Sequence, residues 1–184
     1  MAEPTTTETP AAGVPSPAVP RAGVPLINAA TKARHDTESV VAIAGHPIHV
    51  MLVTFPIALT VATLGGDLLY WLTADPFFAR VSLWTSGWGF GLGLVAAVSG
   101  TAELLLVRGI RLRVAPWDHA VAAMMLLAII GANWGVRLGN HDGAVLPWGL
   151  YLSVLGLLAV ALAGWHGGQL VFEKGIGVSK RSLR

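Results

Sequence analysis

The chain has 184 residues, of which 54% are hydrophobic and 12% are charged, and its formal net charge is +2 at neutral pH. An ordinary soluble domain carries about 25% charged residues, so the composition excludes that class and predicts an integral membrane protein. The absence of cysteine excludes disulfides, thiolate-held iron–sulfur clusters and covalently attached c-type haem. Basic residues collect at segment ends rather than in a stripe, so no nucleic-acid partner is expected.

The two ends of the chain read as tails around one transmembrane domain. The first 36 residues are rich in alanine, proline and threonine, and prolines recur too often for a helix or strand to persist. We therefore predict a disordered tail over residues 1–36. Residues 37–44 predict a short interfacial helix. The transmembrane domain is expected over residues 37–178, and the basic residues 179–184 predict a cytoplasmic tail.

Four long apolar stretches follow one another within the transmembrane domain. They cover about residues 47–72, 81–107, 117–138 and 148–172. Each reaches the roughly 20 residues that a helix needs to cross the hydrocarbon core of a bilayer. Their connections are short, which forces sequential helices to lie antiparallel. The predicted fold is all-α, an integral membrane four-helix up-down bundle with a disordered N-terminal tail.

The basic residues predict the orientation of this bundle. Most lysines and arginines of residues 30–184 fall on the side that holds both chain ends, and only Arg80 and Arg137 fall on the other. Cytoplasmic loops carry an excess of Lys and Arg. We therefore predict a multi-pass protein of the cytoplasmic (inner) membrane with both termini in the cytoplasm and with the lipid bilayer as its surroundings.

Small residues and one proline predict details of the packing. Glycines recur in the second and fourth spans, at Gly87, Gly89, Gly91, Gly93, Gly149, Gly156 and Gly164. They let helix backbones approach closely, which favours packing within the bundle over the alternative of a homo-oligomer. Pro56 has no amide hydrogen and frees the carbonyl of Leu52, so we expect a kink in the first span.

Ionisable side chains gather at the predicted cytoplasmic level of all four spans. They are His46, His49, Glu103, Asp118, His119 and His166. Ionisable groups near lipid are costly and tend to face a bundle interior, a cavity or a ligand. Any single histidine of this set is more simply explained as a helix cap or as a side chain that reaches the headgroups. The convergence of all four histidines favours a shared site.

Three chemistries fit this set. A haem b needs two neutral imidazoles from different helices, which two of the four histidines can provide. A transition metal ion would use three or four of the histidines, with Glu103 or Asp118 completing its ligands. Proton transfer or quinone binding would use a histidine together with a carboxylate that exchanges protons with the cytoplasm. Glu103 and Asp118 are the candidates for this carboxylate, and beside a bound haem or metal ion they would hydrogen-bond to the ligating histidines.

The predicted outer half holds a smaller polar set. Asp67 lies near the outer end of the first span, while Asn133 and Arg137 lie four residues apart, and so on one face, in the third. A buried Asp67–Arg137 pair would neutralise both charges inside the bundle. We favour this structural pair over a transport pathway.

The opening of the transmembrane domain carries a resemblance. The string Gly45-His46-Pro47-Ile48-His49, followed by Phe55-Pro56-Ile57-Ala58 and Asp67, resembles the start of a widespread bacterial family of four-span membrane proteins of unknown function. Further similar stretches extend the resemblance over residues 45–178: 117–119, 134–137, 167–172 and 175–178. Some relatives are joined to Rieske or cytochrome-like domains, so the resemblance implies a redox setting. The 184 residues carry no such domain, and separate redox proteins or a quinone are the expected electron partners.

The sequence therefore leaves two functional classes. The favoured one is an electron-transfer subunit that binds haem b or a metal ion at the histidines. The alternative is a non-catalytic structural or accessory subunit without a cofactor. The sequence contains no Gly-rich phosphate loop, Ser/His/Asp set or nucleotide fingerprint, so an enzyme acting on a soluble substrate is not expected.

Overall fold

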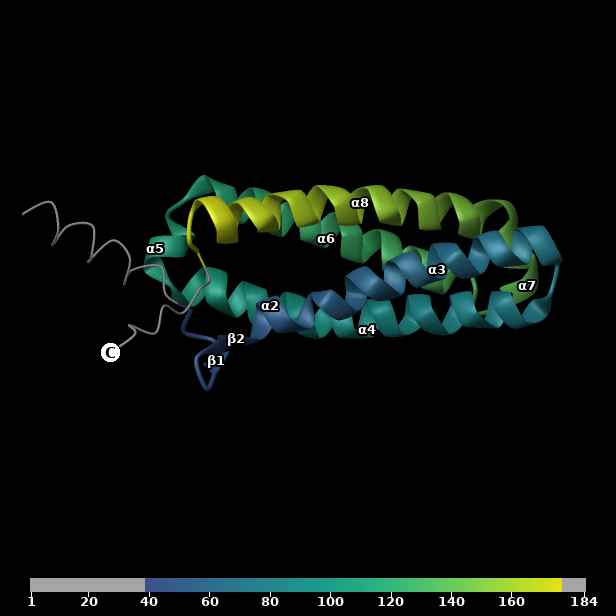
Figure 1. Ribbon diagram of the computed structural model, residues 1–184, viewed down its shortest axis with the longest axis horizontal. Helices are drawn as coiled ribbons and strands as arrows, with labels where there is room; N and C mark the ends of the chain where they lie inside the picture. Colours follow the sequence, from purple (N-terminus) through teal and green to yellow (C-terminus); the bar gives the residue numbers. More distant parts are fainter. Residues whose placement is uncertain (1–38, 177–184) are drawn as a thin grey trace, which may run out of the picture.

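The computed structural model describes residues 39–176, so the predicted tails at 1–36 and 179–184 lie outside the described residues. Four long helical segments run antiparallel to one another in an up-down bundle (Figure 1). They are α2 with α3 (Ile48–Leu52 and Thr54–Thr73), α4 (Pro76–Leu106), α6 (Val114–Gly135) and α8 (Leu150–Gly168). Each segment is long and apolar enough to cross a membrane. The predicted all-α fold is confirmed.

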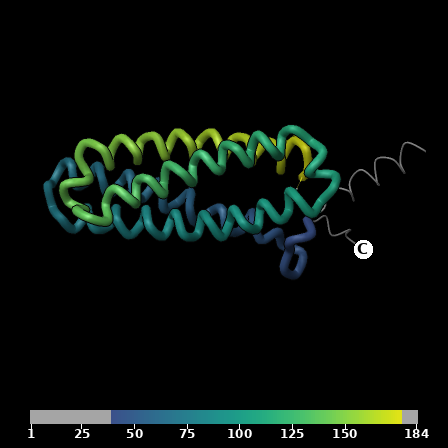
Figure 2. The backbone as a smooth tube through the Cα atoms, turned by 180° about the vertical axis from the view of Figure 1, so that it is seen from behind, coloured from purple at the N-terminus to yellow at the C-terminus, as the bar shows by residue number. Residues whose placement is uncertain are grey.

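The bundle consists of two helical hairpins. In the first hairpin α2 and α3 pack against α4, and in the second α6 packs against α8. Contacts between α4 and α6 and between α3 and α8 close the ring of four (Figure 2). We call the end that carries the strands β1 and β2 the β end, and the opposite end, with the short helix α7 (His141–Ala144), the α7 end.

The first described residues form strands instead of the predicted interfacial helix. β1 (Ala42–Ile43) pairs antiparallel with β2 (His46–Pro47). The two residues between them, Ala44 and Gly45, have φ values of 50° and 81°. Positive φ at both positions is typical of two-residue β-hairpin turns, and Gly45 adopts it at no steric cost. The interfacial helix predicted for residues 37–44 is therefore wrong over the described part, because the turn chemistry outweighs helix propensity.

The first span is interrupted where its proline predicts. The α-helix breaks at Val53, between α2 and α3, three residues before Pro56. Pro56 has no amide hydrogen to donate to the carbonyl of Leu52, so one helical hydrogen bond is missing at this level. The amide of Ile57 still donates to the carbonyl of Val53 at 3.3 Å. The chain therefore continues as a single span across the interruption.

The second and third spans begin earlier than predicted. α4 starts at Pro76, because the carboxylate of Asp75 accepts a hydrogen bond from the amide of Phe77 at 2.9 Å and proline suits the first helical position. The predicted connection between the first and second spans is thereby reduced to two residues, Ala74 and Asp75. α6 spans Val114–Gly135, a shift towards the N-terminus, after the short helix α5 (Arg108–Arg111).

The fourth span is longer than predicted and is kinked near its start. It runs from His141 to Glu173. Between α7 and α8 lies a turn, η1 (Val145–Gly149), in which Leu146 is extended with φ −118° and ψ 130°. The span ends in a π-helical turn, η2 (Gln169–Glu173).

Glycines of the second and fourth spans allow close contacts within the bundle. A Cβ atom on Gly93 of α4 would lie 2.8 Å from Leu127 of α6, and one on Gly156 of α8 would lie 3.2 Å from Thr60 of α3. Real Cβ atoms essentially never lie closer than 3.0 Å to another atom, so the position of Gly93 does not accept a larger residue without a shift. Small residues therefore permit this helix spacing, as predicted. Two members of the predicted set have nothing within 4 Å of such an atom: Gly91 and Gly164.

The interior changes character along the bundle axis. The β end holds an apolar cluster: Leu104, Val107, Ile110, Leu170 and Ile176. A second apolar cluster lies between α6 and α8: Ala122, Leu126, Ile130, Val160 and Ala163. Ala79 and Val145 are buried towards the α7 end, but most of the buried side chains there are polar: Thr63, Asp67, Ser82, Ser86, Asn133, Arg137 and Ser153. Large apolar side chains instead cover the outside, as expected for a lipid-facing surface.

Candidate functional site

Two of the four predicted histidines meet between the hairpins near the β end. His49 comes from α2 in the first hairpin and His119 from the first turns of α6 in the second. Their ring centroids are 6.1 Å apart, and their planes cross at 78°. Both side chains are partly buried. We call this arrangement the paired-imidazole site.

His49 is held by the neighbouring helix of its own hairpin. Its Nδ1 atom lies 2.8 Å from the carbonyl oxygen of Ala96 on α4. The ring lies against Gly100, one turn further along α4, where an added Cβ would be 2.7 Å from both Cε1 and Nδ1. Both the hydrogen bond and the absence of a side chain on Gly100 therefore determine where this ring can lie.

His119 is held in the same manner in the second hairpin. Its Nδ1 atom lies 3.1 Å from the carbonyl oxygen of Ala163 on α8. The ring lies against Gly167, where an added Cβ would be 3.1 Å from Cε1. Alanine and glycine are again four residues apart on the partner helix.

These hydrogen bonds determine which nitrogen of each ring carries the proton. A carbonyl oxygen can only accept a hydrogen bond, so Nδ1 of His49 and of His119 must be the donor. In a neutral imidazole the other nitrogen, Nε2, then carries a free lone pair. Among residues 39–176, neither Nε2 atom has a hydrogen-bond partner. A histidine whose Nδ1–H donates to a backbone carbonyl is the usual arrangement of a metal-ligating imidazole.

The other predicted ligands lie elsewhere. His46 is exposed in β2, and its Nδ1 lies 3.2 Å from the carbonyl oxygen of Ala44. Asp118 and His166 line an open groove on the α6–α8 surface together with Met125. Within the described part of the chain, no group of three or more His, Asp or Glu residues is placed to hold a metal ion. The predicted metal shell of three or four histidines, completed by a carboxylate, is not assembled there.

Glu103 contacts the start of the described chain instead of the histidines. Its carboxylate accepts hydrogen bonds from the amides of Val40 and Val41, at 3.1 and 3.0 Å, and from the hydroxyl of Ser39 at 3.1 Å. Charge-assisted bonds of this kind are stronger than neutral ones. The geometry thus makes Glu103 an anchor for the segment that leads into β1 and α2; its predicted role as a metal ligand or proton-exchanging group stays a prediction.

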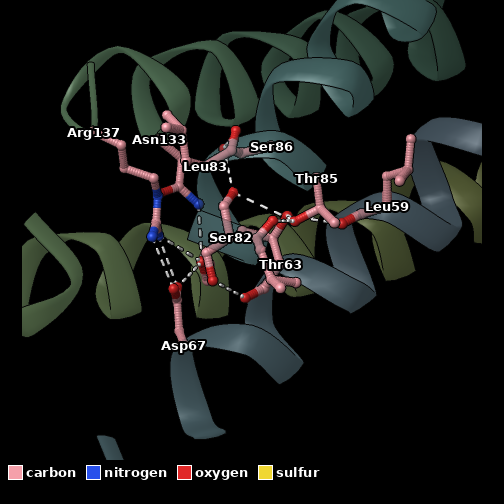
Figure 3. A network of polar contacts seen from close by, with 11 residues as sticks. Leu59, Thr63, Asp67, Ser82, Leu83, Thr85, Ser86, Asn133 and Arg137 are labelled. Atoms are coloured by element: carbon pink, nitrogen blue, oxygen red, sulfur yellow. Dashed lines mark hydrogen bonds and ion pairs between the residues drawn. The ribbon is translucent and has the colours of Figure 1, made fainter. Parts of the chain in front are cut away.

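The α7 end holds the polar pair that the sequence predicts. Arg137 donates two hydrogen bonds to Asp67, from Nη1 to Oδ1 and from Nη2 to Oδ2, each 2.8 Å long, and both side chains are completely buried (Figure 3). Arg137 also donates from Nε and Nη2 to Oδ1 of Asn133 at 3.1 and 2.8 Å. The guanidinium is thereby paired on every nitrogen.

Ser153 of α8 closes this network. Its hydroxyl donates to Asp67, and it accepts a hydrogen bond from Nδ2 of Asn133 at 2.9 Å. Gly149, at the start of the same helix, leaves room for the guanidinium, since an added Cβ would lie 2.7 Å from Nη2 of Arg137. Three helices are therefore joined through one saturated group of polar side chains, which we call the buried ion-pair network.

Comparisons with known proteins identify the family. A family model described as "Predicted membrane protein (DUF2231)" matches residues 45–180. The chain belongs to this family. The DUF2231 match covers most of the chain, and it includes both the paired-imidazole site and the buried ion-pair network. It confirms the expectation of an uncharacterised membrane-protein family. Comparisons with curated proteins and with solved structures found no match.

Several residues that shape the two sites of this DUF2231 chain were not predicted from its sequence. They are Ala96, Gly100, Ala163, Gly167 and Ser153. The alanines act through backbone carbonyls, which no residue type reveals. The two glycines could have been noticed from their spacing. Gly100 follows Ala96 by four residues in the second span, and Gly167 follows Ala163 by four residues in the fourth. Each of these spans comes directly after a span that carries a predicted histidine. Ser153 left no such signal, since a serine in an apolar helix usually bonds its own backbone.

Proposed function

We propose that this membrane protein is an electron-transfer subunit that binds a b-type haem through Nε2 of His49 and Nε2 of His119. The observation that carries the proposal is the geometry of the two rings. They come from different hairpins, each has Nδ1 bonded to a carbonyl, and each leaves Nε2 for a ligand. Two neutral imidazoles from separate helices are what a low-spin haem b requires.

The separation of the rings supports a shared metal centre. Bonds from histidine nitrogen to a metal are about 2 Å long, so the centres of two imidazoles on opposite sides of one ion lie roughly 6 Å apart. The observed separation of the centroids is 6.1 Å. Two imidazoles alone leave at least half of the coordination positions of an isolated ion to other ligands, whereas a porphyrin supplies four nitrogens. This favours haem over a transition metal ion alone.

The arrangement of the hydrogen bonds allows a porphyrin to enter. A porphyrin between the rings would keep their separation, but it is wider than either ring, so the side chains beside the rings at the β end would have to move to admit it. Each histidine is bonded within its own hairpin, to Ala96 or to Ala163, and not across the interface. Such a local rearrangement would therefore leave both imidazoles oriented by their carbonyl partners.

The proposal includes an orientation and a class of partner. The excess of basic residues at the β end supports a cytoplasmic position for that end, in agreement with the inner-membrane orientation that the sequence predicts. Held by His49 and His119, a haem would supply one-electron transfer, accepting the electron from a quinol or a redox protein and passing it to a separate redox protein.

A second candidate is an accessory subunit without a cofactor. The observation in its favour is that the other ionisable groups have structural partners. Glu103 holds residues 39–41, and Asp67 with Arg137 joins three helices. In this case the two rings would only pack edge to face at the hairpin interface.

Purification with haem supplied separates the two candidates. The haem proposal expects a reduced-minus-oxidised difference spectrum of the low-spin type. His49→Ala and His119→Ala should each abolish it, because one axial ligand is then missing. His46→Ala and His166→Ala are the matched controls and should retain it. If the wild-type protein is colourless and elemental analysis finds no metal, the haem proposal is wrong and the accessory subunit is the remaining candidate. If the protein contains a metal ion but no haem, and His49→Ala and His119→Ala each remove that metal, the site is a metal site.

A further inference from the structure

The two hairpins repeat one small motif around their histidines. In each, the ring lies against a glycine of the second helix, and its Nδ1 donates to the carbonyl of the alanine four residues before that glycine. The motif pairs His49 with Gly100 and His119 with Gly167. It occurs once per hairpin, and the two copies face each other across the hairpin interface.

We infer that Gly100 and Gly167 are positioning residues that hold the two imidazoles in the Nδ1-protonated form, with both Nε2 lone pairs available to a ligand between the hairpins. The identity of that ligand rests on the proposed function, but the tautomer of the rings does not. A hydrogen on Nδ1 is a property of the protein without any cofactor. The inference can therefore be tested before haem is added.

The steric argument is strongest at Gly100. A Cβ atom there would lie 2.7 Å from two atoms of the His49 ring, which is closer than real Cβ atoms approach their neighbours. The ring would have to move, and the 2.8 Å bond from Nδ1 to Ala96 would be lost with it. Without a carbonyl acceptor, nothing selects the Nδ1-protonated tautomer over the other.

At Gly167 the same change should be milder. An added Cβ would lie 3.1 Å from Cε1 of His119 and 3.4 Å from its Nδ1, distances that require a shift of only a few tenths of an ångström. The bond from this ring to Ala163 is also longer, at 3.1 Å. The two copies of the motif therefore predict a graded response to the same substitution.

The chain provides a matched control on each helix. Gly91 on α4 and Gly164 on α8 have nothing within 4 Å of an added Cβ. Gly91→Ala and Gly164→Ala introduce the same atom into the same helices without touching a histidine. Any effect of alanine on helix propensity is shared between test and control variants.

The experiment is nitrogen NMR of the cofactor-free protein in detergent, labelled with ¹⁵N in the histidine rings, at a pH where imidazole is neutral. The signals of the two rings are assigned by their loss in His49→Ala and His119→Ala. Both rings of the wild type should be protonated at Nδ1. Gly100→Ala should remove this form for His49 only, and Gly167→Ala should reduce it for His119 only, while the two controls should leave both unchanged.

The outcomes distinguish this inference from the proposed function. Wild-type rings protonated at Nε2 would overturn the inference, and this result does not require either glycine variant to fold. Unchanged tautomers in both test variants, with elution profiles like the wild type, would also overturn it. If both rings are protonated at Nδ1 but the protein takes up no haem, the positioning role of the glycines stands and the proposed haem binding is wrong. If haem binds, Gly100→Ala should shift or lose the low-spin spectrum more than Gly167→Ala does.

Discussion

The two polar regions of the bundle differ in how completely their atoms are paired. In the buried ion-pair network, every nitrogen of Arg137 and both oxygens of Asp67 have a partner. In the paired-imidazole site, each ring uses one nitrogen and leaves the other without a hydrogen bond among residues 39–176. Saturated buried polar groups stabilise a fold, whereas half-paired ones at an interface are available for a ligand. The difference separates a structural network from a proposed binding site within one bundle.

The largest effect should come from breaking the network on one side only. Arg137→Met leaves the carboxylate of Asp67 buried and unpaired, which costs about 3–5 kcal/mol in free energy of unfolding. The double variant Asp67→Leu with Arg137→Met removes both charges and should lose less than either single variant. Thermal unfolding in detergent measures this. Additive losses would show that the two residues act independently.

A smaller effect should come from crowding the same network. Gly149→Ala places a Cβ 2.7 Å from Nη2 of Arg137 and 2.6 Å from the carbonyl oxygen of Ala144. Overpacking of this kind costs about 1–3 kcal/mol. Gly135→Ala, where an added Cβ meets nothing within 4 Å, is the control and should not be destabilised. Equal unfolding temperatures for both variants would mean that the guanidinium can shift freely.

The anchoring contacts of Glu103 at the β end should contribute less to the free energy of unfolding. Glu103→Gln removes the negative charge and one acceptor from the contacts with Val40 and Val41, which corresponds to about 1.5 kcal/mol for a charge-assisted hydrogen bond. Glu173→Gln changes an exposed carboxylate and serves as the control. The expected result is faster proteolysis near residues 39–47 in the Glu103 variant alone. Identical digestion patterns would contradict the anchoring role.

The smallest effect on stability should come from the imidazoles themselves. In the cofactor-free protein, His49→Ala and His119→Ala each remove one hydrogen bond to a carbonyl and should cost only about 1 kcal/mol. The same two changes are expected to abolish haem binding. A loss of stability as large as that of Arg137→Met would instead place the rings with the structural network and weaken the distinction between the two regions.

Much of the site was predictable because its residues are rare in apolar helices. Ionisable groups such as His49, Asp67 and Arg137 stand out in a membrane span, and helix rise alone brings Asp67 and Arg137 to one level. The partners were less visible. Ala96 and Ala163 contribute only carbonyl oxygens, and Glu103 was expected beside the histidines because depth says nothing about which way a side chain points.

The sequence by itself determined the membrane class, the four spans and the two levels at which polar side chains gather, because hydropathy, length and charge act along the chain. Only the tertiary structure decided which groups at one level meet. It left His46 exposed in β2, placed His166 at a groove on the α6–α8 surface, and turned Glu103 towards residues 39–41. The physical reason is that rotation of a helix about its axis depends on how small residues such as Gly100 and Gly167 let its neighbours approach.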